Sequence, residues 1–514
     1  MGEKVNIRLE PAGVELRISK GTSYRDILHE YGVEFPCGGK KRCQKCRIEL
    51  LSGSITQGPD MIQSEDHPGN DNLMVLACQS VASADAVIRV PQWEHIILAD
   101  ETEFLVTPGE GYGIAVDVGT TTLVAQLIDK QSGRIRDVKT ALNPQASYGA
   151  DIISRIEYAM TGPSPLNPGE KSQSQSGSGI LRDLIRHEVG NMIAGMTRED
   201  LLEVKQVLLV GNAVMYHLFG GFDVTPLSFY PFQSPVNGYL NYSAGDLGWA
   251  LDESCQVTFM PWIGGFVGSD MLAGIFATRM HESKETVALI DLGTNGEIAV
   301  GNRERIICAS AAAGPAFEGS CIDMGMRASF GAISSVAWEN GKMAVKVIGN
   351  ETPRGICGSG LLDAVAVLLQ SDQVDAFGNI LGGKDKVHLS GKVYLSQKDI
   401  REFQLAKAAI AAGLDILLKE AGTHCEELFK IYIAGAFGTY LSVENIVQTG
   451  MVEANPEKIV KLGNTALMGA KILMFTDAEE IGRVAGVIEH IGLESKSDFQ
   501  DVFASKMFFS PGIL

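Results

Sequence analysis

Four cysteines near the start of the chain have a spacing that suits metal ligation. Cys37, Cys43 and Cys46 lie close together, and Cys78 follows after 31 further residues. Three close thiolates and one distant one form the usual ligand pattern of a [2Fe–2S] cluster, whose two iron ions need four such ligands. A zinc site is one alternative, but zinc sites usually show two close cysteine pairs, and only Cys43 and Cys46 form one. Four unrelated cysteines are the other alternative.

The sequence around these cysteines predicts a small β-rich module over residues 1–97. Alternating apolar residues with a Pro-Ala-Gly turn between them predict a β-hairpin over residues 5–18. We expect a short helix from residue 22 or 23, a strand at residues 47–51 and a closing strand at residues 86–90. This order fits a β-grasp arrangement, and the cysteine spacing resembles that of the adrenodoxin-like ferredoxins.

Two short motifs that could bind phosphate each follow an apolar strand. They are Asp117-Val-Gly119-Thr120-Thr121-Thr122 and Asp291-Leu-Gly293-Thr294-Asn295. A glycine lets phosphate approach the backbone, and hydroxyl and N–H groups can donate to its oxygens. Aspartates can hold Mg²⁺ through water, because this ion keeps most of its hydration shell. Asp117 and Asp291 are therefore our candidates for organising Mg²⁺ and an attacking water, and Glu297 could join them.

The two motifs also form a weak internal repeat, since 174 residues, about one α/β domain, separate their aspartates. The pair resembles the phosphate loops of the superfamily of actin, the sugar kinases and the heat-shock chaperone ATPases (ASKHA). This resemblance implies that the chain binds ATP and has an adenosine loop. Gly435 and Gly438 follow an apolar strand, and Gly358 and Gly360 open a helix, so all four are candidates for nucleotide binding. Tight packing turns are the alternative for these glycines.

The composition excludes some classes of partner. The chain has 514 residues and a formal net charge of −19. Such acidity argues against binding to nucleic acids and to anionic membranes. The chain has no run of eighteen apolar residues, and its start lacks the apolar run of a signal peptide. We therefore expect neither a nucleic-acid nor a membrane partner, and a cytoplasmic location.

The predicted fold class is an α/β multidomain protein. A β-grasp, ferredoxin-like domain over residues 1–97 is followed by a linker over 98–111. A duplicated actin-like ATPase fold follows, with one subdomain over residues 112–285 and a second over 286–514.

A ferredoxin-like domain joined to an ASKHA ATPase resembles the reductive activators of corrinoid proteins, over essentially the whole chain. Besides the cysteines and phosphate motifs, the resemblance rests on Asn143-Pro144-Gln145, Gly149-Ala150-Asp151, Gly211-Asn212 and residues 314–319 and 434–438. It implies that one electron passes from the cluster to Co(II) of a corrinoid protein, which regenerates Co(I) for methyltransferases while ATP supplies the energy. The implied cofactors are a [2Fe–2S] cluster, ATP and Mg²⁺.

The same resemblance implies two kinds of partner, a corrinoid (cobalamin-containing) protein of a methyltransferase system and an external low-potential electron donor. A homodimer is compatible with the sequence. Three other functions stay open. They are an ATP-driven electron injector for another low-potential metalloenzyme, a redox-regulated ASKHA kinase in which Asp270 could imitate the base, and a nucleotide-binding sensor without catalysis.

Overall fold

The computed structural model describes residues 3–10, 14–28, 33, 46–63, 73–90, 104, 106–162, 176–197, 203–339, 341–435 and 441–509. These residues form two compact units. The first contains the described residues up to 90 together with 120–122, 142–162 and 176–188, and the second contains the rest. The domain boundaries predicted from the sequence do not anticipate this grouping of residues 120–122 and 142–188, and they stay a prediction.

The N-terminal part is a six-stranded sheet with one short helix. Its elements are β1 (Lys4–Glu10), β2 (Val14–Ser19), α1 (Tyr24–Leu28), β3 (Arg47–Gln57), β4 (Asp60–Gln63), β5 (Leu73–Leu76) and β6 (Ser80–Arg89). Val5, Ile7 and Leu9 point into the core because side chains alternate along β1. β1 pairs with β2 as the predicted antiparallel hairpin and with β6 in parallel, which is the predicted β-grasp arrangement. β3 and β6 are each longer than predicted.

A second six-stranded sheet follows, in the order β11-β12-β10-β7-β8-β9. Its strands are β7 (Tyr112–Val118), β8 (Thr122–Asp129), β9 (Ile135–Leu142), β10 (Val204–Val210), β11 (Leu240–Ser243) and β12 (Gln256–Phe259). The helices of this region are α2 (Ile152–Thr161), α3 (Gly177–Thr197), α4 (Ala213–Gly220), α5 (Ala244–Leu247) and α6 (Ser269–Ala277). Residues 114–116 of β7 are buried on both faces, as expected for a central strand.

The third large sheet has the order β22-β21-β13-β14-β15-β23. It consists of β13 (Val287–Leu292), β14 (Gly296–Gly301), β15 (Ile306–Ala311), β21 (Ile431–Ala434), β22 (Ile459–Lys461) and β23 (Ile488–His490). Two small sheets contain β16 (Ala332–Glu339), β17 (Lys342–Val347) and β18 (Gly355–Ile356), and β19 (Lys386–Ser390) and β20 (Val393–Ser396). The helices are α7 (Gly358–Gln370), α8 (Gln397–Glu420), α9 (Val443–Gln448), α10 (Thr465–Leu473), α11 (Ala478–Ala485) and α12 (Phe499–Lys506).

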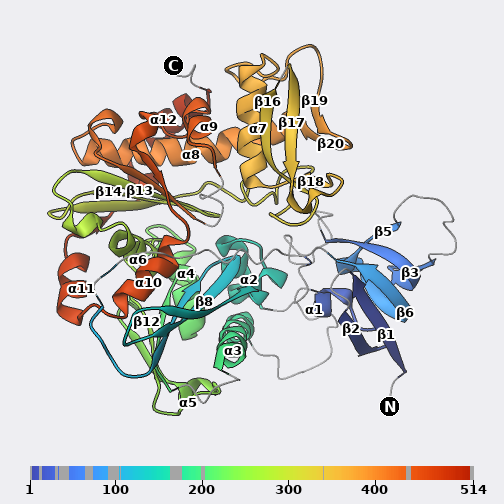
Figure 1. The fold of residues 1–514 in the computed structure, drawn as a ribbon, viewed down its shortest axis with the longest axis horizontal. Helices are drawn as coiled ribbons and strands as arrows, with labels where there is room; N and C mark the ends of the chain where they lie inside the picture. The colour runs from blue at the N-terminus through green and yellow to red at the C-terminus, as the bar shows by residue number, and fades with distance from the viewer. Residues whose placement is uncertain are drawn as a thin grey trace. The chain divides into compact units, whose positions relative to one another are not determined.

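The second and third sheets share one local topology. In each, three consecutive strands are neighbours (β7-β8-β9 or β13-β14-β15), and the first two of them are antiparallel. A parallel strand lies beside the first of the three (β10 or β21), and another parallel strand lies beyond that. The long helix α8 packs on β14 and β15 (Figure 1). α6 and α10 lie side by side, and their close approach requires Gly469, where a Cβ would lie 1.8 Å from the Ala273 carbonyl oxygen. The repeat in sequence thus corresponds to a repeat in structure.

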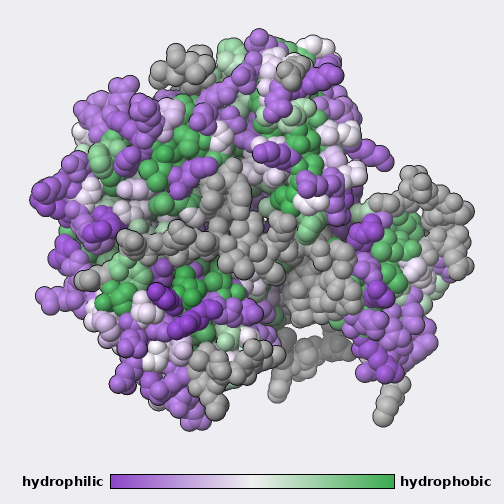
Figure 2. Space-filling model, viewed as in Figure 1, coloured by the Kyte–Doolittle hydropathy of each residue, from purple (hydrophilic) through white to green (hydrophobic). Residues whose placement is uncertain are grey.

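The surface is largely polar. On the face shown in Figure 2, hydrophilic residues cover most of the described surface and hydrophobic residues form smaller patches between them. This agrees with the net charge of −19. None of the helices that the structure describes has the length and apolar character needed to cross a membrane.

Candidate functional site

Cys46 and Cys78 lie together in the N-terminal sheet. Cys46 immediately precedes β3, and Cys78 lies in the 3-10 turn Ala77–Gln79 between β5 and β6. The N–H of Cys78 donates to the Cys46 sulfur at 3.4 Å, and the N–H of Ala77 donates to the Cys46 carbonyl at 2.8 Å. The structure therefore brings two of the four predicted ligands together. Cys37 and Cys43 lie outside the described residues.

The surroundings of this pair suit an iron–sulfur cluster. An N–H group that donates to sulfur stabilises thiolate charge and tunes a cluster's potential. Cys46 is buried in an apolar core with Ile48 and Val75, which keeps water away from its sulfur. In the part of the chain that the structure describes, no three His, Cys, Asp or Glu side chains are grouped to hold a metal ion.

Asp117, the first residue of the first phosphate motif, lies at the carboxyl end of β7. The pair Val118–Leu123 closes the turn that joins β7 to β8 and contains Gly119. The side-chain amide of Asn464 donates to Oδ2 of Asp117 at 2.6 Å. Burial raises the pKa of Asp117 to about 7, against the opposing effect of the Asn464 hydrogen bond. The carboxyl is therefore poised to lose its proton when a cation binds beside it.

Asp291 occupies the equivalent place on β13. Its partner across the β13–β14 hairpin is Glu297, and within the turn the Gly293 N–H donates to the Asn295 carbonyl at 3.1 Å. The Thr465 hydroxyl donates to Oδ2 of Asp291 at 3.4 Å. Burial raises the pKa of Asp291 to about 6, and the Thr465 hydrogen bond opposes the rise. The two halves of the sequence repeat therefore present their aspartates in the same way.

The start of α10 contacts both aspartates. Asn464 is the N-cap of this helix, because its Oδ1 accepts from the Leu467 N–H at 2.8 Å while its amide nitrogen donates to Asp117. Thr465, the next residue, donates to Asp291. Two consecutive residues thus connect the ends of β7 and β13, one strand from each of the two repeated sheets. This contact brings the two predicted metal-organising aspartates to one site.

Asp270 and Glu297 add two more carboxyl groups to Asp117 and Asp291. Burial and the neighbouring Asp117 charge raise the pKa of Asp270 to about 7. Burial, followed by the charges of Asp270 and Asp291, raises the pKa of Glu297 well above its usual range. All four residues are partly buried. Carboxylate oxygens suit Mg²⁺, but the described residues contain no group of three such side chains close enough to hold a metal ion, so electrostatic coupling alone links Asp270 and Glu297 to the two aspartates.

The turn that contains the threonines of the first motif accepts hydrogen bonds from residues elsewhere in the chain. Thr120 is buried, whereas Thr121 and Thr122 are partly exposed. The Arg155 guanidinium donates to the Thr120 carbonyl, and the Asn143 N–H donates to the Thr121 carbonyl at 2.9 Å. Two backbone oxygens of the loop are therefore fixed by residues from beyond β9.

The second motif has two close neighbours. The hydroxyl of Thr294, a buried residue, donates to the Glu318 carboxylate at 2.5 Å. Gly435 follows β21 with a φ of 103°, and a Cβ there would lie 2.3 Å from the Leu292 carbonyl oxygen. Only glycine fits this conformation and this close approach to the end of β13. The structure thus places Gly435 beside the second motif.

Gly358 and Gly360 lie in the first turn of α7, as the sequence predicts for a glycine turn that opens a helix. A Cβ on Gly358 would lie 2.1 Å from the Phe317 carbonyl oxygen, and one on Gly360 would lie 2.2 Å from that of Ile333. Both glycines therefore allow the backbones to pack closely, whatever else they do. Gly438, the last predicted nucleotide-binding residue, lies outside the described residues.

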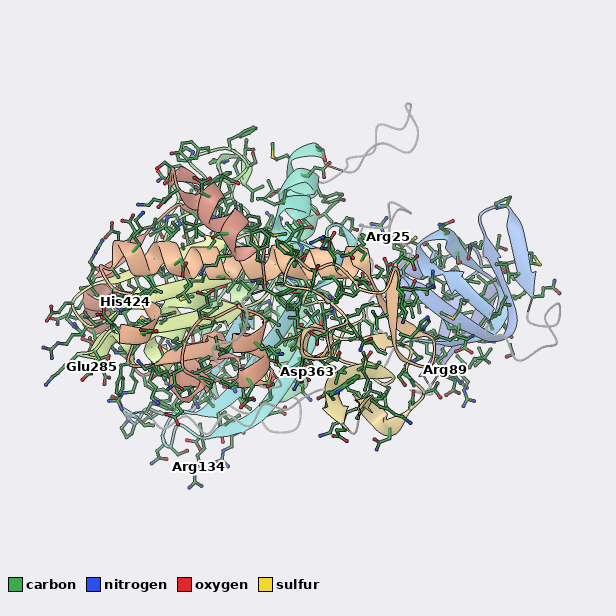
Figure 3. The ribbon with its side chains drawn as sticks, turned by 90° about the horizontal axis from the view of Figure 1, so that it is seen from above. Arg25, Arg89, Arg134, Glu285, Asp363 and His424 are labelled. Atoms are coloured by element: carbon green, nitrogen blue, oxygen red, sulfur yellow. The ribbon has the colours of Figure 1, made fainter. Side chains whose placement is uncertain are left out.

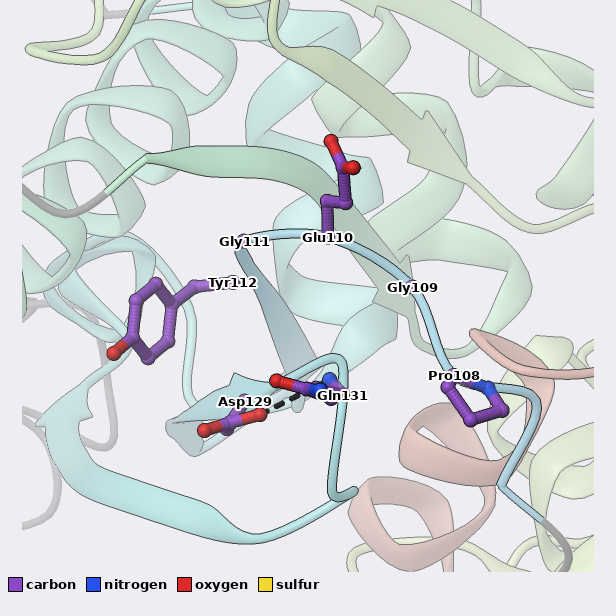
Figure 4. Close-up of a pocket in the computed structure, with 7 residues that line it drawn as sticks. All are labelled: Pro108, Gly109, Glu110, Gly111, Tyr112, Asp129 and Gln131. Atoms are coloured by element: carbon purple, nitrogen blue, oxygen red, sulfur yellow. Dashed lines mark hydrogen bonds between the residues drawn. The ribbon is translucent and has the colours of Figure 1, made fainter.

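A pocket of about 470 Å³ lies elsewhere (Figure 4). It is lined by residues 108–112 with Asp129 and Gln131, at the start of β7. Asp117 is at the other end of this strand, about 16 Å away at the usual rise per residue. The pocket carries neither phosphate motif, so we attach no nucleotide to it.

The sequence alone does not identify Asn464, Thr465 and Arg155 as site residues. Asn464 and Thr465 stand just before an apolar run, which is a helix N-cap signal but carries no information on a contact with Asp117. Arg155 lies four residues beyond the Gly149-Ala150-Asp151 motif and looks like an ordinary helix residue. Nothing local in the sequence marks it as fully buried.

Comparisons with known families match three successive regions of the chain. Residues 7–83 match a 2Fe-2S iron-sulfur cluster binding domain. Residues 112–283 match the RACo middle region, and residues 285–512 match the C-terminal domain of RACo, the ASKHA domain. The predicted fold class, a ferredoxin-like domain followed by an ASKHA fold, is therefore confirmed. The first match shows a cluster-binding domain, and the last implies nucleotide binding.

Individual relatives match most of the chain. The corrinoid activation enzyme RamQ of Eubacterium limosum is 29% identical over 97% of this chain and 98% of its own. A [Co(II) methylated amine-specific corrinoid protein] reductase of Methanosarcina barkeri is 26% identical over 77% of each chain. The solved structure of a reductive activator for corrinoid, iron-sulfur protein is 26% identical, covers 99% of this chain and 98% of its own, and has a TM-score of 0.68.

These matches confirm reductive activation of corrinoid proteins as the predicted function. The chain belongs to the RACo-type family of corrinoid activation enzymes, with an N-terminal 2Fe-2S domain and a C-terminal ASKHA domain.

Proposed function

We propose that this protein couples ATP hydrolysis to the transfer of one electron to the Co(II) centre of a corrinoid protein, which regenerates Co(I). The electron comes from an external low-potential donor and passes through the [2Fe–2S] domain. ATP and water yield ADP and phosphate in the same cycle. The contact of Asn464 and Thr465 with Asp117 and Asp291 is the observation that supports the proposal, because it brings the aspartates of the two repeated motifs to the start of one helix, as a shared Mg-ATP site requires.

We assign the cluster to Cys37, Cys43, Cys46 and Cys78. When bound, a cluster of this kind accepts and releases one electron at a time. The N–H of Cys78 stabilises negative charge on the Cys46 sulfur, and the apolar core beside Cys46 excludes water from it. These residues therefore hold the cluster and tune it, in a module whose sheet supports both described ligands.

We assign the nucleotide phosphates to the two motifs. Asp117 and Asp291 organise Mg²⁺ and the attacking water through their carboxylates. The remaining phosphate-binding residues are Gly119, Thr120, Thr121, Thr122, Gly293, Thr294 and Asn295. The adenosine is assigned to the glycine turns with Gly358, Gly360, Gly435 and Gly438, of which Gly435 adjoins the second motif.

The need for ATP has a thermodynamic reason. A plant-type [2Fe–2S] cluster has a potential of about −400 mV, and a Co(II) corrinoid with axial ligands is harder to reduce. ATP can close this gap only if its binding or hydrolysis favours one conformation of the protein over another. The partner that benefits is the corrinoid protein, which we propose belongs to a methyltransferase system. The name of the Methanosarcina barkeri relative supports this kind of partner.

Anaerobic reduction of a Co(II) corrinoid protein tests the proposal. The full-length protein, a strong reductant and Mg-ATP are mixed with it, and the visible spectrum is followed for Co(I). We expect Co(I) only with ATP, and none from Asp117→Asn or Asp291→Asn although both keep the cluster spectrum. Asp477→Asn is the matched control, because Asp477 is exposed and only caps α11, which Asn does equally well. Full ATPase rates in both site variants would overturn the assignment.

A further inference from the structure

A fully buried arginine holds the first phosphate motif. The Arg155 guanidinium on α2 donates to the Thr120 carbonyl, to the Gly149 carbonyl at 2.9 Å and to Oε1 of Gln145 at 3.2 Å. A buried cation is costly unless hydrogen bonds satisfy its donors, so these contacts fix the guanidinium in one place. Any shift of Thr120 must therefore move Arg155 together with Gly149 and Gln145, or break these bonds.

The segment from Asn143 to Gly149 connects to the same loop a second time. The Asn143 N–H donates to the Thr121 carbonyl at 2.9 Å, and the Asn143 side chain caps the following turn by accepting from the Gln145 N–H at 3.0 Å. The Gln145 side chain also donates to the Leu181 carbonyl of α3 at 2.8 Å. Asn143 and Gln145 are fully buried. The segment is thus held at both ends and follows the phosphate loop as one piece.

Arg25 of the ferredoxin-like domain contacts the middle of this segment. Its guanidinium donates to the Ser147 carbonyl at 2.8 Å and lies 5.4 Å from the centroid of the Tyr148 ring. The Tyr148 ring packs against Tyr158 at 4.6 Å between centroids. Figure 3 marks Arg25, and the residues on both sides of this contact belong to the first compact unit. Helix α1 is therefore joined to the segment by a hydrogen bond and a cation–π contact.

Helix α1 also packs against the turn Ala77–Gln79, which carries Cys78. The contacts thus run without a gap from the carbonyls of Thr120 and Thr121 to a predicted cluster ligand. Residues 120–122 and the described residues of 142–188 belong to the same compact unit as the ferredoxin-like sheet.

We propose that Arg155 and Arg25 are positioning residues that couple the first phosphate loop to the ferredoxin-like domain, so that nucleotide binding and the redox state of the cluster influence each other. This inference rests on the proposed function, in which the loop binds ATP phosphates and Cys78 binds the cluster. Phosphate bound at Thr120–Thr122 shifts the loop, and Arg155 passes the shift to the segment that Arg25 holds. Linkage requires the effect to be equal in both directions.

The test measures this coupling directly. A non-hydrolysable Mg-ATP analogue is titrated calorimetrically into anaerobic full-length protein, once with the cluster oxidised and once after chemical reduction. We expect the two Kd values of the wild type to differ by about fivefold, at the low end of typical coupling between sites. In Arg25→Ala the ratio falls to one, while the visible spectrum and the Kd of the oxidised protein stay as in the wild type.

Two further variants separate positioning from folding. Arg155→Lys keeps the charge but loses the planar fork, so it raises KM for ATP more than it lowers kcat and also removes the redox dependence of Kd. Arg89→Ala is the matched control, because Arg89 pairs with Glu49 inside the ferredoxin-like domain at 2.8 Å, and it keeps the wild-type ratio.

The possible outcomes distinguish a failure of this inference from a failure of the proposed function. If the wild type binds nucleotide and cluster but has the same Kd for nucleotide in both redox states, the inference is wrong while the proposed function stands. The same holds if Arg25→Ala keeps the wild-type ratio of the two Kd values. A wild type that binds no nucleotide, or forms no cluster on the four cysteines, overturns the proposed function.

Discussion

Replacement of Asn464 by Ser isolates the hydrogen bond between the start of α10 and Asp117. Ser also caps helices, so the bond to the Leu467 N–H is kept, but its hydroxyl is too short to reach Asp117. A hydrogen bond to a charged group contributes about 1.5–3 kcal/mol, so its loss weakens ionisation of the carboxyl about tenfold or more. Because Asn464 donates to the charged form, the variant raises the pKa of Asp117 above its value of about 7.

The assay is the pH dependence of kcat/KM for Mg-ATP hydrolysis, which reports the ionisation of the free enzyme. Since the ionised form of Asp117 organises Mg²⁺, kcat/KM of the wild type should rise as the pH increases through about 7 and then level off. In Asn464→Ser the rise moves to higher pH. At pH 7 the variant should lose roughly 7- to 80-fold in kcat/KM, and it should approach the wild type only well above its raised pKa.

Asn464→Ala is the companion variant. It removes the cap as well, so it should show the same displaced pH profile and lose about 1 kcal/mol more stability than Asn464→Ser. A profile of Asn464→Ser that overlies the wild type would refute the reasoning. A loss of equal size at every pH would refute it too, because it would assign Asn464 a role unrelated to the charge of Asp117.

Three further predictions concern the cluster, the second motif and the core. Cys46→Ser and Cys78→Ser should each abolish the visible absorption and the iron content of the anaerobically purified protein. Cys308→Ala changes a buried thiol on β15 and should keep both. A cluster that survives the loss of Cys46 or Cys78 would contradict the ligand assignment. Gly435→Ala should raise KM for ATP at least tenfold, because its Cβ would meet the Leu292 carbonyl. Gly422 also has a positive φ but lies in open space, so Gly422→Ala should leave KM unchanged. Equal KM values for the two variants would contradict the role of Gly435. Burial lowers the pKa of Lys407 to about 8, so the folded protein loses this proton at a lower pH than the unfolded chain does. The free energy of unfolding should therefore rise by up to about 3 kcal/mol between pH 8 and 10.5. Lys407→Met lacks this gain, so the difference between its unfolding free energy and that of the wild type should change with pH in denaturant titrations; a constant difference would be the contrary result.

Local patterns were enough to predict the strands and the framework of the site, whereas the actin-like fold was predicted from the resemblance of the two phosphate motifs to those of a known superfamily. Alternation in residues 5–9 and the apolar runs before Asp117 and Asp291 determine strands through side-chain burial, which acts on the nearest residues. The cysteine spacing and the repeated motif predicted residues that the structure then brought together in two cases, Cys46 with Cys78 and Asp117 with Asp291.

The partners of those residues could not be predicted, because they depend on tertiary contacts. β3 continues to Gln57 because β4, β5 and β6 all pair with it, and no local signal reports such pairing. Arg155 has the same type and spacing as a surface arginine, yet it is fully buried around backbone oxygens. The motif Asn143-Pro144-Gln145 stood out in the sequence, but only the structure shows that the Asn143 N–H donates to the Thr121 carbonyl.

The contact between Asp117 and Asn464 also has a consequence for the order of events during synthesis. The two residues are 347 positions apart in the chain. At a usual translation rate of about 5–20 residues per second, the ribosome needs roughly 20–70 s to add the second after the first. The first half can form its strands in that time, but it lacks the group that holds Asp117. Asp117 therefore gains its hydrogen-bond partner only after α10 has emerged, late in the synthesis of the chain.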